Sequence, residues 1–247
     1  TREILDAYAA VAPVTVLHDP EHRKQQAGVV TAMARSAFVD HGADWVVNGD
    51  ADEFLRPLDP TRTLADVLAE MPTSLGAFTV PVVNMVGRMA HSGSGIRRLT
   101  LRDERSVEAL QAAGVHAHPT PNAIHVGSAD VQVAHGNHFT SIEQVGTVPE
   151  GLELEVLHYP WRSSEQFERK TRNMALAYLA NPLLRREVEK NLDEWLKSPV
   201  SLLFFKKIRR LQIGERVVHW QSLGPGPVAE SEWMSLDDKG DDAFLLV

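Results

Sequence analysis

The sequence predicts an α/β protein whose mostly parallel central sheet is flanked by helices, with a helical C-terminal part. Helical and strand-like segments alternate along the first 50 residues, in the order helix, strand, helix, strand. A later run, residues 77–86, is rich in β-branched residues. The chain has 247 residues, of which 43% are hydrophobic and 23% are charged, so it can bury a sizeable core.

The first half of the chain gives the clearest elements. Apolar residues at helical spacing predict a helix over residues 4–11, and Pro13 ends it. Residues 14–17 predict a short buried strand, and residues 23–41 a second helix that stops at a glycine. Residues 45–47 predict a strand that leads directly into an acidic turn.

The middle of the chain alternates between short elements and one long connection. Residues 64–71 predict a helix, and residues 77–86 a strand. Residues 87–121 predict a long loop or an insertion near the active site. Three further short strands are expected over residues 123–126, 131–134 and 152–157.

The character of the chain then becomes helical. Ser163 and Gln166 form a capping-box pattern at the start of a helix. Two more helices are expected over residues 182–197 and 200–211, followed by a Gly/Pro-rich and acidic tail. We therefore expect a catalytic domain over residues 1–180, incomplete at its N-terminus, and a helical extension with an acidic tail over residues 181–247.

Composition excludes several classes of function. The net charge of -8 and the pI near 5.8 give no basic field for nucleic acid. The absence of cysteine excludes disulfides, cysteine-zinc sites and thiol nucleophiles. No apolar run reaches the roughly 20 residues that span a bilayer, and no signal peptide is visible, so we expect a cytoplasmic protein.

A basic stretch leaves a contact with the inner face of the membrane open. It flanks the apolar residues 202–205 and consists of Lys206, Lys207, Arg209 and Arg210. Such a helix could bring an enzyme to a lipid-linked acceptor. The commoner alternative is a packed helix with a basic solvent-facing side.

The strongest chemical signal is the aspartate pair Asp50 and Asp52, directly after the strand at residues 45–47. Ligands of open α/β sheets bind at the carboxyl ends of strands. Two carboxylates held together repel unless a cation joins them, and Mg²⁺ or Mn²⁺ prefers oxygen ligands. The pair predicts a divalent-metal site that binds a diphosphate, the alternative being a solvated acidic turn.

A second constellation follows the strand at residues 152–157. His158 could supply a neutral imidazole as a third metal ligand, or be a hydrogen-bonded structural histidine. Arg162 precedes the helix that starts near Ser163, and a helix N-terminus with an adjacent arginine suits a diphosphate. Lys170 lies about two turns into that helix and could also reach phosphate, unless it is on a solvated face.

Three segments together resemble the family-2-like glycosyltransferases: DWVVNGDADEFL from Asp44, AHGNH from Ala134 and LHYPWRSSEQFERK from Leu157. The resemblance covers roughly residues 14–180. It implies a GT-A fold, the nucleotide-diphospho-sugar transferase fold, with one or two strands before the present start. It also implies a nucleotide-sugar donor, Mn²⁺ or Mg²⁺, and inversion. Asn122 departs from the pattern, because a basic residue is expected there.

We therefore expect a glycosyltransferase that moves a sugar from a nucleotide-diphosphate-sugar donor to a glycan, lipid-linked or other hydroxyl acceptor. Inversion needs a general base near the attacking hydroxyl. Glu53, Asp130, Glu143 and His138 are the candidates, with Glu53 and His138 put forward as catalytic residues. His138 could instead contact the donor sugar or the acceptor.

Two other classes of function stay open. A haloacid-dehalogenase-like phosphatase would use Asp50 as nucleophile and Asp52 as acid and base, although Phe54 stands where that family has threonine or valine. A non-catalytic binding module would keep the same site and bind the donor without transfer.

Overall fold

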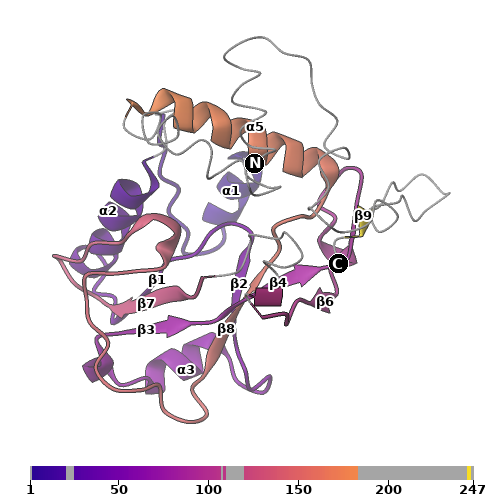
Figure 1. Cartoon of the computed structure of the whole chain (residues 1–247). Helices are drawn as coiled ribbons and strands as arrows, with labels where there is room; N and C mark the ends of the chain where they lie inside the picture. The colour runs from indigo at the N-terminus through magenta and orange to yellow at the C-terminus, as the bar shows by residue number, and fades with distance from the viewer. Residues whose placement is uncertain (1, 21–24, 107, 110–119, 183–243, 246–247) are drawn as a thin grey trace.

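The computed structural model describes residues 2–20, 25–106, 108–109, 120–182 and 244–245 (Figure 1). The helices and helical turns are α1 (Arg2–Ala9), α2 (Gln26–Val39), α3 (Leu64–Glu70), η1 (Thr73–Leu75), η2 (Ile96–Arg98), η3 (His135–Asn137) and α5 (Ser164–Ala180). The strands are β1 (Trp45–Val47), β2 (Glu53–Pro57), β3 (Ala77–Val80), β4 (Val82–Val86), β5 (Arg88–Met89), β6 (Leu101–Arg102), β7 (Asn122–Val126), β8 (Leu154–His158) and β9 (Phe244–Leu245).

Two mostly antiparallel sheets form the frame. The first has the order β1-β7-β3, and β7 runs antiparallel to both neighbours. The second has the order β2-β8-β4-β6, in which β8 and β4 are parallel and the other two pairs are antiparallel. A short pair, β5 and β9, is also antiparallel.

The predicted GT-A fold, with a mostly parallel central sheet flanked by helices, is therefore wrong. The fold is mixed α/β with few helices in the described part of the chain. Parallel neighbours need a crossover of about a dozen residues or more. Here only residues 48–52 separate β1 from β2, and only Pro81 separates β3 from β4. Such short connections send consecutive strands into different sheets.

Several predicted elements are confirmed and others are wrong. The strand over residues 45–47 and the helix over residues 64–71 are present as β1 and α3. Residues 14–17 form no strand, and residues 131–134 contribute only a bridge between Val133 and Thr140. The connection after residue 87 contains β5, η2 and β6. The helices expected over 182–197 and 200–211 and the acidic tail lie outside the described residues, apart from residue 182 and the short β9.

The larger core lies where α3 packs below the strands (Figure 1). Thr63 and Asp66 cap α3 reciprocally, so the helix begins at a defined residue. Its Val67 is fully buried, and so is Phe78 of β3, whose ring meets Trp45 edge-on at a centroid distance of 5.3 Å. The remaining buried members are Met71, Leu75, Val80, Val82, Ile124, Leu152, Leu154 and Val156.

A smaller core attaches α2 to the first sheet. Ala34 of α2 and Val46 of β1 pack with Val131 and Val133. The side chain of Arg35 adds a hydrogen bond of 2.8 Å from Nε to the carbonyl of Val131. None of the helices in the described part of the chain is both long enough and apolar enough to cross a bilayer.

A buried carboxylate fastens the second sheet. Glu155 of β8 is only 2% exposed, and it accepts hydrogen bonds from Arg56 of β2 and Arg102 of β6. Hydrogen bonds from Arg102 hold the pKa of Glu155 below its ordinary value, although burial alone would raise it. Arg56 and Arg102 come from β2 and β6, which are not adjacent in the sheet, so Glu155 links strands on both sides of β8.

We expect Phe78→Ala to destabilise the fold by about 3–5 kcal/mol, because it opens a cavity in the larger core. The free energy of unfolding from urea titration measures the change. Phe139→Ala is the matched control, since Phe139 is 65% exposed and its truncation leaves no buried cavity. Equal losses in the two variants would contradict the assignment of this core.

Glu155→Gln should lower the free energy of unfolding at neutral pH by about 1–3 kcal/mol, since it weakens charged hydrogen bonds. The pKa of Glu155 is depressed in the folded state, so its contribution is complete above the unfolded-state pKa of about 4.3 and is lost as the pH falls.

The variant should therefore lose less stability than the wild type between pH 6 and pH 3, as urea titrations at both pH values will report. Glu104→Gln is the control, because Glu104 also pairs with Arg102 but its side chain is 74% exposed. An unchanged pH dependence in Glu155→Gln would contradict the proposed ionisation.

Candidate functional site

The acidic turn lies between the two sheets. Strand β1 ends at Val47, and β2 begins at Glu53 after a turn in which the Glu53 N–H donates to the Asp50 carbonyl at 3.0 Å. Because β7 is antiparallel to β1, the first residue of β7, Asn122, lies at the same end of the sheet as the last residue of β1. Asp50 is exposed, whereas Asp52 is 7% exposed.

The buried carboxylate of Asp52 contacts two residues from distant parts of the chain. The Lys170 ammonium donates to Oδ2 at 2.7 Å, and Nε2 of His158 lies 3.9 Å from Oδ1. Burial raises the pKa of Asp52, but the hydrogen bond and charge of Lys170 outweigh it, so the pKa lies below its ordinary value. Asp52 is therefore an anion held by a lysine.

His158 is prepared as an acceptor rather than as a cation. Its Nδ1 is 2.8 Å from Oδ1 of the buried Asn84, so Nδ1 carries the proton and donates to the amide oxygen. Burial lowers the pKa of His158, and together with the positive charges of Lys170 and Arg162 it outweighs the negative charges of Asp52 and Asp50, which raise the pKa. The neutral ring then presents the Nε2 lone pair to the Asp52 carboxylate, an arrangement of two acceptors that a shared cation would relieve.

Amides from two other segments hold Asp50. Gln26 of α2 donates to its Oδ1 at 3.1 Å and Asn137 donates to the same oxygen at 3.2 Å. Asn137 has a left-handed backbone, with φ of 63°, and follows Gly136, which has φ of 79°. A side chain at Gly136 would also collide with the His138 ring. The AHGNH segment is thus a tight turn that delivers an amide to Asp50.

Glu53 directly follows Asp52 and is the third carboxylate of the acidic turn. Its Oε2 accepts hydrogen bonds from the Asp50 N–H at 3.0 Å and from Asn122 at 2.7 Å. Burial raises the pKa of Glu53, and the negative charges of Asp50 and Asp52 add to the effect. A carboxylate with a raised pKa is a better proton acceptor, which suits a general base. The amide at Asn122, where a basic residue was expected, positions this carboxylate.

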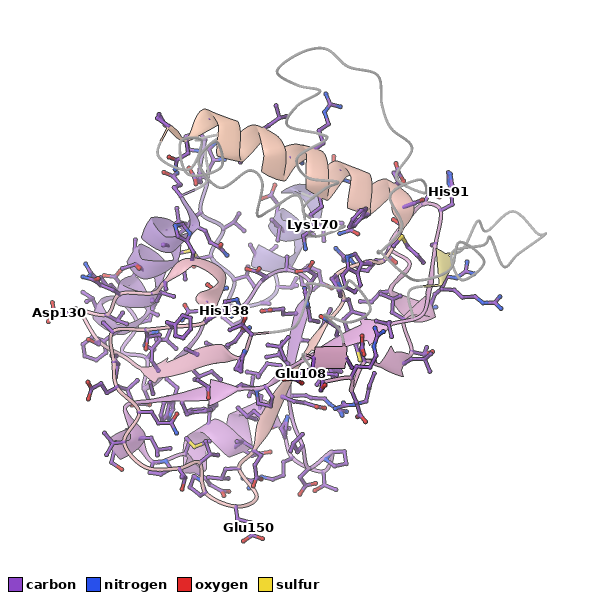
Figure 2. The ribbon with its side chains drawn as sticks, in the orientation of Figure 1. His91, Glu108, Asp130, His138, Glu150 and Lys170 are labelled. Carbon is purple, nitrogen blue, oxygen red and sulfur yellow. The ribbon has the colours of Figure 1, made fainter. Side chains whose placement is uncertain are left out.

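The other candidates for a general base are Asp130, Glu143 and His138, of which His138 lies next to this cluster. Asp130 is exposed at the outer margin of the molecule, far from Lys170 in the view of Figure 2. Glu143 is exposed, and its backbone lies beside Gly76. His138 is half-buried and donates through Nδ1 to the Pro121 carbonyl at 3.2 Å, next to Asn122.

The start of α5 is occupied by protein groups. Ser163 is fully buried and accepts a hydrogen bond from the Gln166 N–H at 3.2 Å, so the serine half of the predicted capping box is present, whereas Oε1 of Gln166 has no partner among the described residues. Its hydroxyl donates to the Gly93 carbonyl, and the N–H groups of Ser164 and Glu165 donate to the carbonyls of residues 90 and 91. The groups at this helix terminus that were expected to bind a diphosphate therefore already have protein partners, and the expectation is left to the side chains of Arg162 and Lys170.

Several residues of this cluster were missed in the sequence. Asn84, Asn137 and Gln26 make contacts that no predicted role covered. Asn84 did give a signal, because it is a polar residue in the middle of an apolar strand, VVNMV. A buried amide of this kind usually has a specific partner.

A divalent metal fits the chemistry of Asp52 and His158. Metal–ligand bonds of about 2.1 Å place cis ligand atoms of an octahedral site about 3.0 Å apart, so Nε2 and Oδ1, which are 3.9 Å apart, would have to approach by about 0.9 Å to share an ion. No group of three or more histidine, aspartate or glutamate side chains with metal-binding geometry occurs in the described residues. Mg²⁺ commonly takes only one or two carboxylates, with water and substrate phosphates as its other ligands.

Unpartnered buried amide atoms surround the acidic turn. Within the described part of the chain, Nδ2 of Asn48 and the Oδ1 atoms of Asn122 and Asn137 have no hydrogen-bond partner, and all three residues are less than 9% exposed. One donor and two acceptors beside the acidic turn are thus buried without a partner.

Comparisons with protein-family models, curated proteins and solved structures find no match to this chain.

We expect Asn84→Ala to disturb the tautomer of His158, since the amide oxygen no longer accepts the Nδ1 proton. Nitrogen-15 shifts of the imidazole should report a protonated Nδ1 in the wild type and a mixture of tautomers in the variant. Asn48→Ala, which removes a buried amide without a contact to His158, is the control. A protonated Nε2 in the wild type would contradict the assigned geometry.

Proposed function

We propose that the chain is a metal-dependent glycosyltransferase that uses a nucleotide-diphosphate-sugar donor, related to the family-2-like enzymes. The observation that supports this most is the convergence of Asp52, His158 and Lys170, which come from two of the three segments that carry the sequence resemblance. The proposal depends on these side chains and not on a parallel sheet.

Each charged group has a role in this proposal. Asp52 and His158 would hold Mn²⁺ or Mg²⁺, with Asp50 beside them, and Lys170 and Arg162 would face the diphosphate. The bound metal supplies charge neutralisation for the diphosphate as it leaves. The two cationic side chains stabilise the same developing charge, and preorganised groups of this kind commonly contribute about 3 kcal/mol to transition-state stabilisation.

Glu53 is the general base in this proposal. Asn122 and the Asp50 N–H fix one oxygen of its carboxylate, and burial raises its pKa. The base would take a proton from an acceptor hydroxyl, on a glycan or a lipid-linked saccharide.

Two alternatives are less well supported. A phosphatase of the haloacid-dehalogenase type needs Asp52 as an acid, yet the Lys170 contact holds the pKa of Asp52 low. A binding module without catalysis would need no general base, whereas Glu53 lies beside the proposed metal ligands with one carboxylate oxygen fixed by Asn122 and the Asp50 N–H. Hydrolysis of p-nitrophenyl phosphate would favour the first, and donor binding without transfer or hydrolysis would favour the second.

Thermal unfolding with a panel of nucleoside diphosphates and their sugars, with and without Mn²⁺, tests the proposal. A ligand at 100 times its dissociation constant stabilises the native state by about 2.7 kcal/mol. We expect one nucleotide series to raise the melting temperature only when Mn²⁺ is present. Asp52→Asn should abolish this metal-dependent rise, because it removes the charge of a proposed ligand.

Asp59→Asn is the matched control, since Asp59 is exposed and contacts Thr61. A nucleotide sugar that binds should then be turned over with an acceptor panel, and Glu53→Gln should slow the transfer. If no nucleotide stabilises the wild type with either metal, the proposed donor class is wrong.

A further inference from the structure

The contact between Lys170 and Asp52 bears on how the binding of a metal and the binding of a diphosphate affect each other. We propose that Lys170 takes the place of the divalent metal on Asp52 and moves to the diphosphate when the metal binds, so that Lys170 couples the two binding events. This inference rests on the proposed function, and it concerns the regulation of the same site.

The first step is the charge on Asp52. A buried carboxylate without a counter-charge is costly, and a lysine at 2.7 Å supplies that charge in the absence of metal. The nearby His158 cannot do so, because its Nδ1 proton goes to Asn84 and Nε2 faces Asp52 as an acceptor. Among the described residues, Lys170 is therefore the cation that pairs with Asp52 in the protein alone.

The second step is the competition with a metal. An ion bound to Asp52 and His158 would lie beside the Lys170 ammonium, and two cations at one carboxylate repel each other. Binding of the metal alone must then weaken the Lys170 contact without giving the ammonium a new partner. We expect the metal alone to bind weakly for this reason.

The third step is the mobility of the lysine. The first turn of α5 is fixed by hydrogen bonds to residues 90–93. Lys170 lies farther along the helix, and its side chain is 46% exposed (Figure 2). A flexible four-carbon stem lets the ammonium move while the helix stays in place. A diphosphate offers it new oxygen partners, and Asp52 then becomes available to the metal.

The consequence is positive coupling between metal and diphosphate. A diphosphate that removes Lys170 from Asp52 raises the affinity for the metal, and by linkage the metal raises the affinity for the diphosphate by the same factor. The site would then fill only when both ligands are present, which a metal complex of a nucleotide sugar satisfies.

The first test measures Mn²⁺ binding to the full chain by the electron paramagnetic resonance signal of free Mn²⁺. Lys170→Met should bind Mn²⁺ about tenfold more tightly than the wild type, equivalent to about 1.4 kcal/mol. Lys170→Arg should bind no more tightly than the wild type, because a guanidinium also pairs with the carboxylate.

Arg172→Met is the matched control, since Arg172 is an exposed cation two residues along the same helix. Its effect on Mn²⁺ affinity should stay within roughly twofold, because salt screens exposed charges. If Lys170→Met unfolds, Lys170→Gln, which keeps a neutral donor, replaces it. Equal Mn²⁺ affinity in the wild type and in the folded charge-removing variant would overturn the proposal.

The second test repeats the titration with imidodiphosphate, corrected for the Mn²⁺ that this probe binds in protein-free solution. The increase in Mn²⁺ affinity caused by the probe should be several-fold larger in the wild type than in Lys170→Met. The same increase in both would show that Lys170 does not couple the ligands. Neither titration contains a nucleotide or a sugar, so failure of the donor panel and failure of this inference give different results.

Discussion

The antiparallel register of β2 and β8 is the constraint on which the site depends. It sets Glu53 opposite His158 across about a hundred residues of sequence, and the Tyr159 N–H donates to the Asp52 carbonyl at 2.9 Å. The pairing of β2 with β8 thus fixes the backbone of the acidic turn and also places the imidazole of His158 beside it. Farther along the same pair of strands, Glu155 of β8 accepts hydrogen bonds from Arg56 of β2 and from Arg102 of β6, which also hold the sheet together.

Electrostatics then decides the state of each group. Asp52 and Glu53 are adjacent and both half or more buried, yet their pKa values move in opposite directions. The difference comes from their partners, because Asp52 has an ammonium and Glu53 has only an amide and a backbone N–H. Two carboxylates whose pKa values are shifted apart can serve two tasks, one holding a cation and one accepting a proton.

The sequence predicted several local elements and drew attention to residues that lie together in the structure, but it did not predict the pairing of strands. The apolar run before Asp50 and the serine cap before α5 are local signals, and both are present. The alternation of helix and strand indicated parallel strands. The connections at residues 48–52 and at Pro81 are too short for the crossover that parallel neighbours need, and this length was not weighed against the pattern. Asn84 and Asn137 were missed because an amide's role depends on a partner far away in sequence. The roles of the metal and the diphosphate stay predictions.

Pro81 makes the site sensitive to the length of the chain. This one residue joins β3 of the first sheet, which packs in the core with α3, to β4 of the second sheet, which carries Asn84. Side chains alternate along a strand, so one inserted residue would turn Asn84 toward the face now occupied by Val83 and Met85. The imidazole would then lose its orientation although no residue of the acidic turn had changed. Length variation among relatives of this chain should therefore be rare at this junction and be found instead in exposed loops.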